Sequence, residues 1–137
     1  MQAVTAKGQT PASNGVDDIC TAIENIELFQ GLSIDILTNP NLILNVSGVS
    51  YLIIDNLTMT NKPYTIGGYT YNVSFYIYDY DYNNSSNIST IKSYSKANNI
   101  NNLIIDISNC NYINLKAGAT VASTSIGSVK LSNVYFS

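Results

Sequence analysis

The sequence predicts an all-β domain with one short helix near its N-terminus. After Gly31, short segments rich in leucine and β-branched residues recur roughly every ten residues, and each is followed by Asn, Ser, Gly or Thr, as in strands joined by turns. Charged residues make up only 11% of the 137-residue chain, so its surface must be polar without being charged. A chain of this length suits a single domain with a core of its own.

The chain begins with small, polar residues, and Gly8, Pro11 and Gly15 interrupt any regular element there. This composition predicts a flexible arm over residues 1–15, followed by one β-rich domain over residues 16–137. The arm contains no apolar stretch of the kind found in signal peptides. No part of the chain has the roughly 18 consecutive apolar residues that a membrane span requires, so we expect no such span.

A short helix is expected between the arm and the strands. Four apolar side chains recur there at helical spacing, namely Val16, Ile19, Ile23 and Ile26. Asp17 and Asp18 suit the positive end of a helix dipole. We therefore predict a helix over Asp17–Phe29 that ends at Gly31.

The strands follow in order along the chain. The first three are expected at residues 32–37, 42–46 and 52–55. The run Tyr69–Tyr80 alternates in polarity and predicts the longest strand, entered through a tight turn at Ile66–Gly68. Residues 81–89 have the composition of a polar loop. The last strands are expected around residues 103–107, 113–115 and 129–136.

One phrase occurs twice. The stretch LILNVSGVSYLII (Leu42–Ile54) aligns with LIIDISNCNYINL (Leu103–Leu115), 61 residues further along. Tyr51 aligns with Tyr112. We interpret the phrase as a unit of architecture whose apolar rows are covered by stacking or by adjoining copies, and not as a chemical site.

Similar phrases, with Asn, alternating apolar residues and a polar turn, occur in YNVSFYIYD and GSVKLSNVYF. They resemble the coils of right-handed parallel β-helices, the pectin-lyase-like fold also found in phage tailspikes. The stretch NGVDDICTAI (Asn14–Ile23) resembles the capping helix that precedes the first coil in that family. The resemblance implies a short right-handed parallel β-helix. The length of the run Tyr69–Tyr80 leaves an antiparallel β-sandwich or jelly roll as the alternative.

Composition excludes several functions. The six basic residues are all lysine and the net charge is −3, so neither the electrostatic attraction nor the arginine contacts that nucleic-acid binding uses are available. Without histidine, neither a His general base nor a Ser–His or Cys–His nucleophile pair can form. We therefore predict a non-enzymatic protein with no catalytic residue and no cofactor. The pair Asp79 and Asp81 is the remaining option for glycoside hydrolysis.

The run Asp79–Ser85 places oxygen ligands at alternate positions, as the first half of a calcium loop does. The position of the bidentate Glu that closes such a loop is occupied by Thr90. No metal site is therefore predicted.

Three sets of residues are candidate sites. Six N-x-S/T sequons would make the chain a glycoprotein if modified: Asn45, Asn56, Asn72, Asn83, Asn84 and Asn87. Cys20 and Cys110 are either two small buried apolar side chains or a disulfide that closes a long loop. Five tyrosines are candidates for a subunit interface, with a sugar-stacking platform as the alternative: Tyr69, Tyr71, Tyr76, Tyr78 and Tyr80.

Together these observations predict a structural protein of an extracellular assembly. Few carboxylates leave few groups whose protonation would unfold the chain in acid, and the whole looks most like a virion component, capsid or spike, of an archaeal virus in a hot acidic habitat. It would associate with copies of itself or with other structural subunits through sheet edges and a tyrosine-rich face. The alternatives are a cell-surface filament or pilus subunit joined by strand exchange, and a carbohydrate-binding or carbohydrate-cleaving β-helix with a host-surface glycan as partner.

Overall fold

The structure, a computed structural model, describes residues 30–137, and this part of the chain is all-β. The predicted arm, the predicted helix over Asp17–Phe29 and Cys20 lie outside the described residues. Eight strands form two four-stranded sheets. Sheet 1 has the order β1 (Leu32–Ile36), β12 (Gly127–Phe136), β3 (Tyr51–Asn61), β8 (Asn98–Asp106). Sheet 2 has the order β2 (Asn41–Asn45), β9 (Tyr112–Gly118), β6 (Ser74–Asp81), β7 (Ser86–Ser95).

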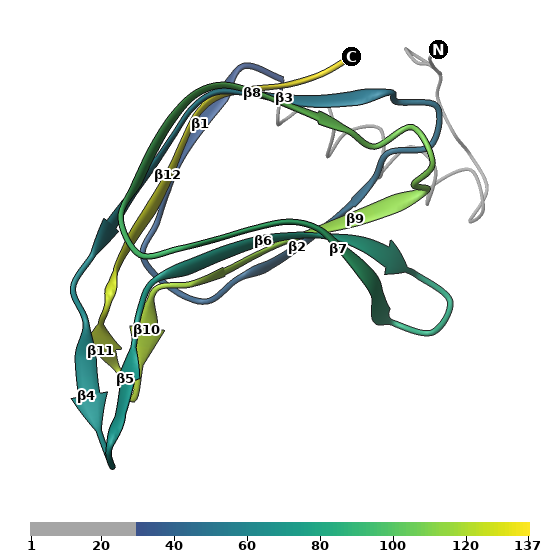
Figure 1. Cartoon of the computed structure of the whole chain (residues 1–137). Helices are drawn as coiled ribbons and strands as arrows, with labels where there is room; N and C mark the ends of the chain where they lie inside the picture. Colours follow the sequence, from purple (N-terminus) through teal and green to yellow (C-terminus); the bar gives the residue numbers. More distant parts are fainter. Residues whose placement is uncertain (1–29) are drawn as a thin grey trace, which may run out of the picture.

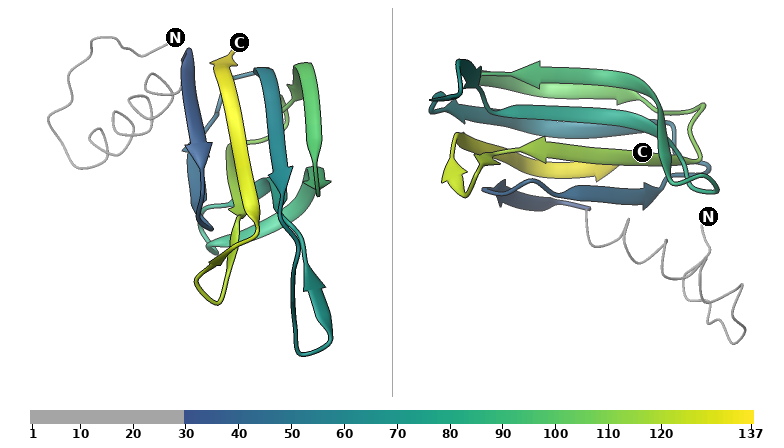
Figure 2. Two further views of the ribbon diagram at one scale, coloured as in Figure 1. Left: turned by 90° about the vertical axis from the view of Figure 1, so that its left-hand side faces the viewer. Right: turned by 90° about the horizontal axis from the view of Figure 1, so that it is seen from below.

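The two sheets lie face to face, and every neighbouring pair of strands is antiparallel (Figures 1 and 2). Two short hairpins project from one end of this sandwich: β4 (Tyr64–Ile66) with β5 (Tyr69–Tyr71), and β10 (Thr120–Val121) with β11 (Thr124–Ser125). The prediction of a parallel β-helix is wrong, because the turns send the chain across to the opposite sheet and not onto a coil below. Antiparallel sheets agree with the alternative of a β-sandwich.

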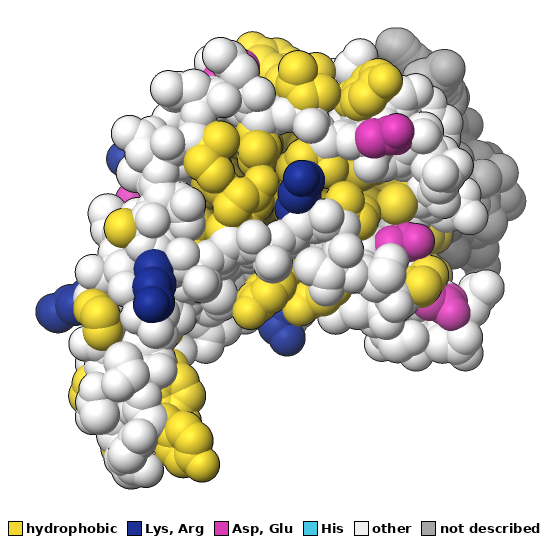
Figure 3. Space-filling model, viewed as in Figure 1, with side chains coloured by type: hydrophobic (Ala, Val, Ile, Leu, Met, Phe, Trp, Pro, Cys, Tyr) yellow, Lys and Arg dark blue, Asp and Glu magenta, His cyan; other side chains and the backbone are white. Residues whose placement is uncertain are grey.

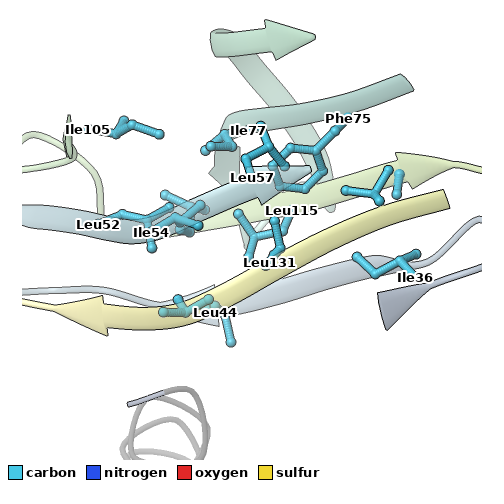
Figure 4. Close-up of a cluster of buried hydrophobic side chains, with 14 of the residues drawn as sticks. Ile36, Leu44, Leu52, Ile54, Leu57, Phe75, Ile77, Ile105, Leu115 and Leu131 are labelled. Carbon is cyan, nitrogen blue, oxygen red and sulfur yellow. The ribbon is translucent and has the colours of Figure 1, made fainter. Parts of the chain in front are cut away.

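Alternation of side chains builds the core between the sheets (Figure 4). Leu52 and Ile54 of β3 point into the core from sheet 1, Phe75 and Ile77 of β6 point into it from sheet 2, and all four side chains are fully buried. The strands β8, β9 and β12 add further buried side chains, namely Ile105, Ile113, Leu115, Val129, Leu131 and Val134. Because burial of each such side chain contributes about 1.5–3 kcal/mol, this core is the main source of stability.

The repeated phrase forms two equivalent crossings between the sheets. Its first copy runs from β2 to β3 and its second from β8 to β9, and the copies pair with each other in both sheets. In sheet 2, Leu42 lies opposite Leu115, and in sheet 1, Ile54 lies opposite Leu103. The two copies are therefore related by an approximate two-fold axis.

The turns of the two copies repeat the same hydrogen bonds. The N–H of Val46 donates to the Asn111 carbonyl (2.8 Å), and the equivalent N–H of Ile107 donates to the Ser50 carbonyl (2.8 Å). Within each turn, Val49 N–H donates to Val46 and Cys110 N–H donates to Ile107. The side chains that begin the turns, Asn45 and Asp106, also accept from equivalent backbone N–H groups two residues further on. The phrase thus encodes architecture, as its repetition indicates.

Several segments differ from the sequence-based expectation. No strand was expected where β7 (Ser86–Ser95) lies, and β3 (Tyr51–Asn61) and β8 (Asn98–Asp106) are longer than the expected strands at residues 52–55 and 103–107. The run Tyr69–Tyr80 is not one strand, because it is interrupted between β5 and β6. There the N–H of Val73 donates to the Asn61 side chain and its carbonyl accepts from Lys96, so Val73 leaves the β4–β5 ladder. The expected loop at residues 81–89 is also shorter, since β7 already begins at Ser86.

Candidate functional site

The outer face of sheet 2 carries tyrosine and asparagine side chains. Because Phe75 and Ile77 point into the core, Tyr76, Tyr78 and Tyr80 point outward from β6. The rings of Tyr76 and Tyr78 are stacked, with centroids 5.5 Å apart and planes at 17°. We call the surface formed by Tyr76, Tyr78, Tyr80, Tyr82, Tyr112, Asn41, Asn87 and Asn114 the Tyr–Asn face.

A second stacked pair lies at the end of this face nearest the β6–β7 turn. Tyr82, which follows β6, stacks on Tyr112 of β9 with centroids 4.5 Å apart and planes at 18°. Tyr112 lies opposite Tyr80 in the register of the two strands. The face therefore has four ring planes fixed in two pairs.

Asn114 occupies the middle of the face and is only 2% exposed. Its Nδ2 donates to the Oδ1 atoms of Asn41 on β2 and of Asn87 on β7, each at 3.1 Å. The Oδ1 of Asn114 is buried and accepts no hydrogen bond from any residue between 30 and 137. A buried, unpaired carbonyl oxygen is costly by roughly 1–3 kcal/mol, so Asn114 stands out among the polar residues of the described chain.

The register explains how Asn114 reaches two strands away. On β6, which separates β9 from β7, Tyr78 lies opposite Asn114 and Tyr80 lies opposite Asn87. The Asn114–Asn87 hydrogen bond therefore crosses β6 between these two tyrosines. The crossing side chains fill the space between the rings, which is why Asn114 is buried on an outer face.

Sheet 1 carries an apolar row on its own outer face. Tyr135 of β12 lies opposite Ile53 of β3, which lies opposite Ile104 of β8. Ile104 is 62% exposed and Tyr135 is 40% exposed, while Ile53 is half-buried between them. We call these three residues the apolar row; it ends at β8, the edge strand of sheet 1.

The side of the sandwich where β7 and β8 lie is open to solvent. Figure 3 looks onto this side and shows apolar side chains in the gap between the sheets, around one lysine. Four half-buried side chains of the two edge strands pack against the core here, namely Ile91, Tyr94, Ile100 and Leu103. Lys92 lies opposite the inward-facing Ile77, so its position is on the inner side of β7. Inward-pointing lysines on edge strands oppose sheet extension.

The structure separates the five tyrosines that the sequence suggested as one interface. Tyr76, Tyr78 and Tyr80 belong to the Tyr–Asn face, whereas Tyr69 and Tyr71 lie on the projecting β4–β5 hairpin, where Tyr69 is 70% exposed. Sequence reasoning missed the contributions of Tyr82, Tyr112 and Asn114. The signal for Asn114 was an amide within the otherwise apolar stretch YINL.

The six sequons differ in what their side-chain amides do. Asn83 is exposed and its side chain makes no hydrogen bond with the described residues. By contrast, Asn56 is half-buried, and its Nδ2 donates to Asn99 and Asn101, each at 2.8 Å. The other four sequon side chains, Asn45, Asn72, Asn84 and Asn87, each make at least one side-chain hydrogen bond.

The two aspartates that could have formed a hydrolytic pair have separate structural surroundings. Asp81 closes the β6–β7 turn by accepting from the N–H groups of Asn83 and Asn84 and from the Asn84 side chain (2.7 Å). These bonds lower the pKa of Asp81 below its usual value, the Asn84 side chain having the largest effect. Asp79 instead lies beside Cys110, whose side chain is buried; Cys20, with which a disulfide was the alternative expectation, lies outside the described residues. Burial, and then the Asp79 carboxylate, raise the pKa of the Cys110 thiol to about 11.

Within residues 30–137, no cluster of three His, Cys, Asp or Glu side chains is placed to hold a metal ion. The same residues contain no helix that is long and apolar enough to cross a membrane. No protein-family model matches the chain, and a comparison with curated protein sequences finds no match.

Proposed function

We propose that the protein is a non-enzymatic structural subunit of an extracellular assembly, and that it forms part of a virion as a capsid or spike component. The order in which its strands alternate between the sheets supports this. Counted along the chain, β1, β3, β8 and β12 belong to sheet 1, while β2, β6, β7 and β9 belong to sheet 2. Two interleaved four-stranded sheets of this order form an eight-stranded jelly roll, an architecture frequent in viral capsid and lectin domains.

Because one fold serves many functions, the proposal rests on a surface and not on the fold alone. The apolar row of Tyr135, Ile53 and Ile104 is the observation that carries it. A row of large apolar side chains that reaches an unpaired sheet edge is a surface that other subunits cover. In β8 itself the only charged residue is Asp106, at its end, so little opposes its approach to another subunit.

The β7 edge of sheet 2 is less suited to contact with another subunit. Lys92 lies on the inner side of β7, and a charge there opposes pairing with a further strand. Association is therefore directed to the β8 edge and the apolar row beside it. The nearly uncharged surface agrees with such an assembly, because contacts between subunits would include few ion pairs that a change of pH could break.

The test is self-association of the purified full chain, followed by sedimentation velocity over a wide concentration range. Ile104→Lys places a charge in the apolar row and should shift the chain to the monomer. Leu37→Lys is the matched control, because Leu37 is a similarly exposed apolar residue (57%) in the β1–β2 connection, and it should leave association unchanged. A wild-type chain that stays monomeric at every concentration contradicts the proposal.

Electron microscopy of the native source material separates the two kinds of assembly. Closed shells or spikes that bind an antibody against this chain support a virion component. Long filaments that bind the antibody support the alternative of a surface filament or pilus subunit.

A further inference from the structure

We infer that the Tyr–Asn face of sheet 2 is a binding site for a neutral saccharide. This site lies on the sheet opposite to the apolar row, so it is independent of the proposed assembly surface. Its ligand would stack on the paired tyrosine rings and accept hydrogen bonds from Asn41 and Asn87.

The first step of the argument is the orientation of two amides. The Oδ1 atoms of Asn41 and Asn87 both accept from the Nδ2 of Asn114. Each amide therefore turns its oxygen toward Asn114 and its own NH₂ group away from it. Asn41 and Asn87 are exposed, and neither NH₂ group donates to a described residue, so both donors face solvent.

The second step is their spacing. Because both Oδ1 atoms lie 3.1 Å from the same nitrogen, they are at most about 6 Å apart. The donors are the two Nδ2 atoms, which turn away from Asn114 and are therefore farther apart than the Oδ1 atoms. Two fixed donors at this wider spacing can bind hydroxyls of two neighbouring rings, so the ligand is an oligosaccharide.

The third step is the adjoining aromatic surface. Tyr78 and Tyr80 flank the Asn114–Asn87 hydrogen bond, and Tyr76 extends the surface by stacking on Tyr78. The faces of tyrosine rings offer flat apolar contact, and their hydroxyls add polar contact at the rim. Aromatic faces beside fixed amide donors suit a ligand that has both C–H and O–H groups, which is the chemistry of a sugar.

The fourth step is the charge of the ligand. Asp79 and Asp81 alternate with the tyrosines along β6, so their positions are on the opposite side of the strand. Asp79 contacts buried Cys110 there. Among the residues that the structure describes, the face therefore presents no carboxylate to a cation. Lys116, opposite Tyr76, is its one charged side chain among the paired positions of the described strands, and one lysine does not make an anion site. A neutral ligand fits this surface best.

Asn114 has the role of a positioning residue in this site. It is buried and does not reach the ligand, but it fixes the two amides that do. The cost of leaving its own Oδ1 unpaired is consistent with a residue retained for the arrangement it imposes on its neighbours.

The test uses the full chain, produced without glycosylation, on an array of neutral gluco-, manno-, galacto- and xylo-oligosaccharides. Binding to at least one of them is expected. In titrations of the ¹⁵N-labelled chain with that oligosaccharide, the side-chain NH₂ signals of Asn41 and Asn87 should shift. Tyr78→Ala and Asn87→Ala should each weaken binding at least tenfold.

Tyr135→Ala is the matched control, because it removes an exposed tyrosine from the other sheet; it should leave saccharide affinity unchanged. Asn114→Leu tests the positioning role and should weaken binding. In this variant the side-chain NH₂ groups of Asn41 and Asn87 should no longer have chemical shifts distinct from those of freely exposed asparagine side chains. Should Asn87→Ala fail to fold, Asn87→Asp removes the same donor with little change of shape. Should Asn114→Leu fail to fold, Asn114→Asp removes the donor to Asn41 and Asn87 in the same way.

Three results overturn the inference. The first is a chain that binds none of the oligosaccharides. The second is binding that Tyr78→Ala and the Asn87 variants leave unchanged. The third is loss of self-association in Tyr78→Ala, which would show that a second copy covers this face. The first two results concern saccharide binding alone, and in the third the Ile104→Lys variant still reports separately on the apolar row, so failure of this inference and failure of the proposed function are distinguishable.

Discussion

Gly127 lies against Thr60 so closely that a Cβ at Gly127 would stand 2.0 Å from the Thr60 carbonyl oxygen. Gly127 is buried at the start of β12, opposite Asn61 of β3, and its φ of +137° is one that other residues rarely adopt. Only glycine permits the two central strands of sheet 1 to come together at this point.

Gly127→Ala should therefore destabilise the fold by about 3 kcal/mol or more, because the backbone must move where the two central strands of sheet 1 meet. Gly48→Ala is the control: Gly48 also has a positive φ, but nothing lies within 4 Å of its added Cβ, so only the cost of the backbone conformation, about 1–2 kcal/mol, is expected. Urea unfolding of both variants measures the difference. Equal losses would contradict the close approach.

The Asn39 side chain links the β1–β2 connection to the segment after β9 by hydrogen bonds, at the end of the sandwich where the hairpins project. Its Oδ1 accepts from the N–H groups of Ala119 (2.7 Å) and Thr120 (3.0 Å), and its Nδ2 donates to the Thr120 carbonyl. Asn39→Ala should lower the free energy of unfolding by about 1–3 kcal/mol, since the N–H of Ala119 loses its acceptor. Asn111→Ala removes an exposed amide without such bonds and should have little effect. Chemical denaturation of the two variants decides the matter.

The sequons should differ in occupancy when the chain is expressed in a host that glycosylates Asn residues. Asn83 offers an exposed amide and should carry a glycan, whereas a glycan on Asn56 would disrupt the bonds to Asn99 and Asn101. Peptide mapping by mass spectrometry gives the occupancy of each site. High occupancy of Asn56 in the folded protein would be inconsistent with the hydrogen-bonded arrangement of sheet 1.

The β6–β7 turn should respond to acid through Asp81. Because hydrogen bonds lower its folded pKa, its contribution to stability is complete above the unfolded pKa of about 3.9 and is lost as the pH falls through the folded value. Asn84→Ala removes the largest of these effects and should raise the pKa of Asp81. Carboxyl-carbon NMR titration measures both values. Ser108→Ala, which acts on Asp106 in another turn, should leave Asp81 unchanged.

Cys110 should be an unreactive thiol in the folded chain, because burial first and then the Asp79 carboxylate raise its pKa to about 11. The folded environment favours the neutral thiol. The contribution of Cys110 to stability is therefore present below the unfolded thiol pKa and is lost as the pH rises toward 11. In a Cys20→Ser variant, labelling by a thiol reagent at pH 8 should be slow until urea unfolds the chain. Rapid labelling of the folded variant would contradict this environment. Peptide mapping of the unreduced wild type decides between the two alternatives for Cys20 and Cys110, two separate thiols or a disulfide.

The chemistry of the candidate sites was only partly predictable. The polarity of the surface and the outward direction of Tyr76 and Tyr78 follow from composition and from alternation along β6. The role of Asn114 does not, because its partners Asn41 and Asn87 come from strands that are far apart in the sequence. Nor could the sequence show that Tyr69 and Tyr71 belong to a separate hairpin, since the break at Val73 depends on the Asn61 side chain.

The sequence by itself determined where most strands lie, how little charge the surface carries, and that one phrase is used twice as scaffold. Alternation with a period of two, however, is the same in parallel and antiparallel strands. The choice between a β-helix and a sandwich was made by contacts between distant segments, such as Leu42 with Leu115 and Ile54 with Leu103. Only the tertiary structure could decide it, because the direction of a neighbouring strand is a property of the pair and is not written in either strand.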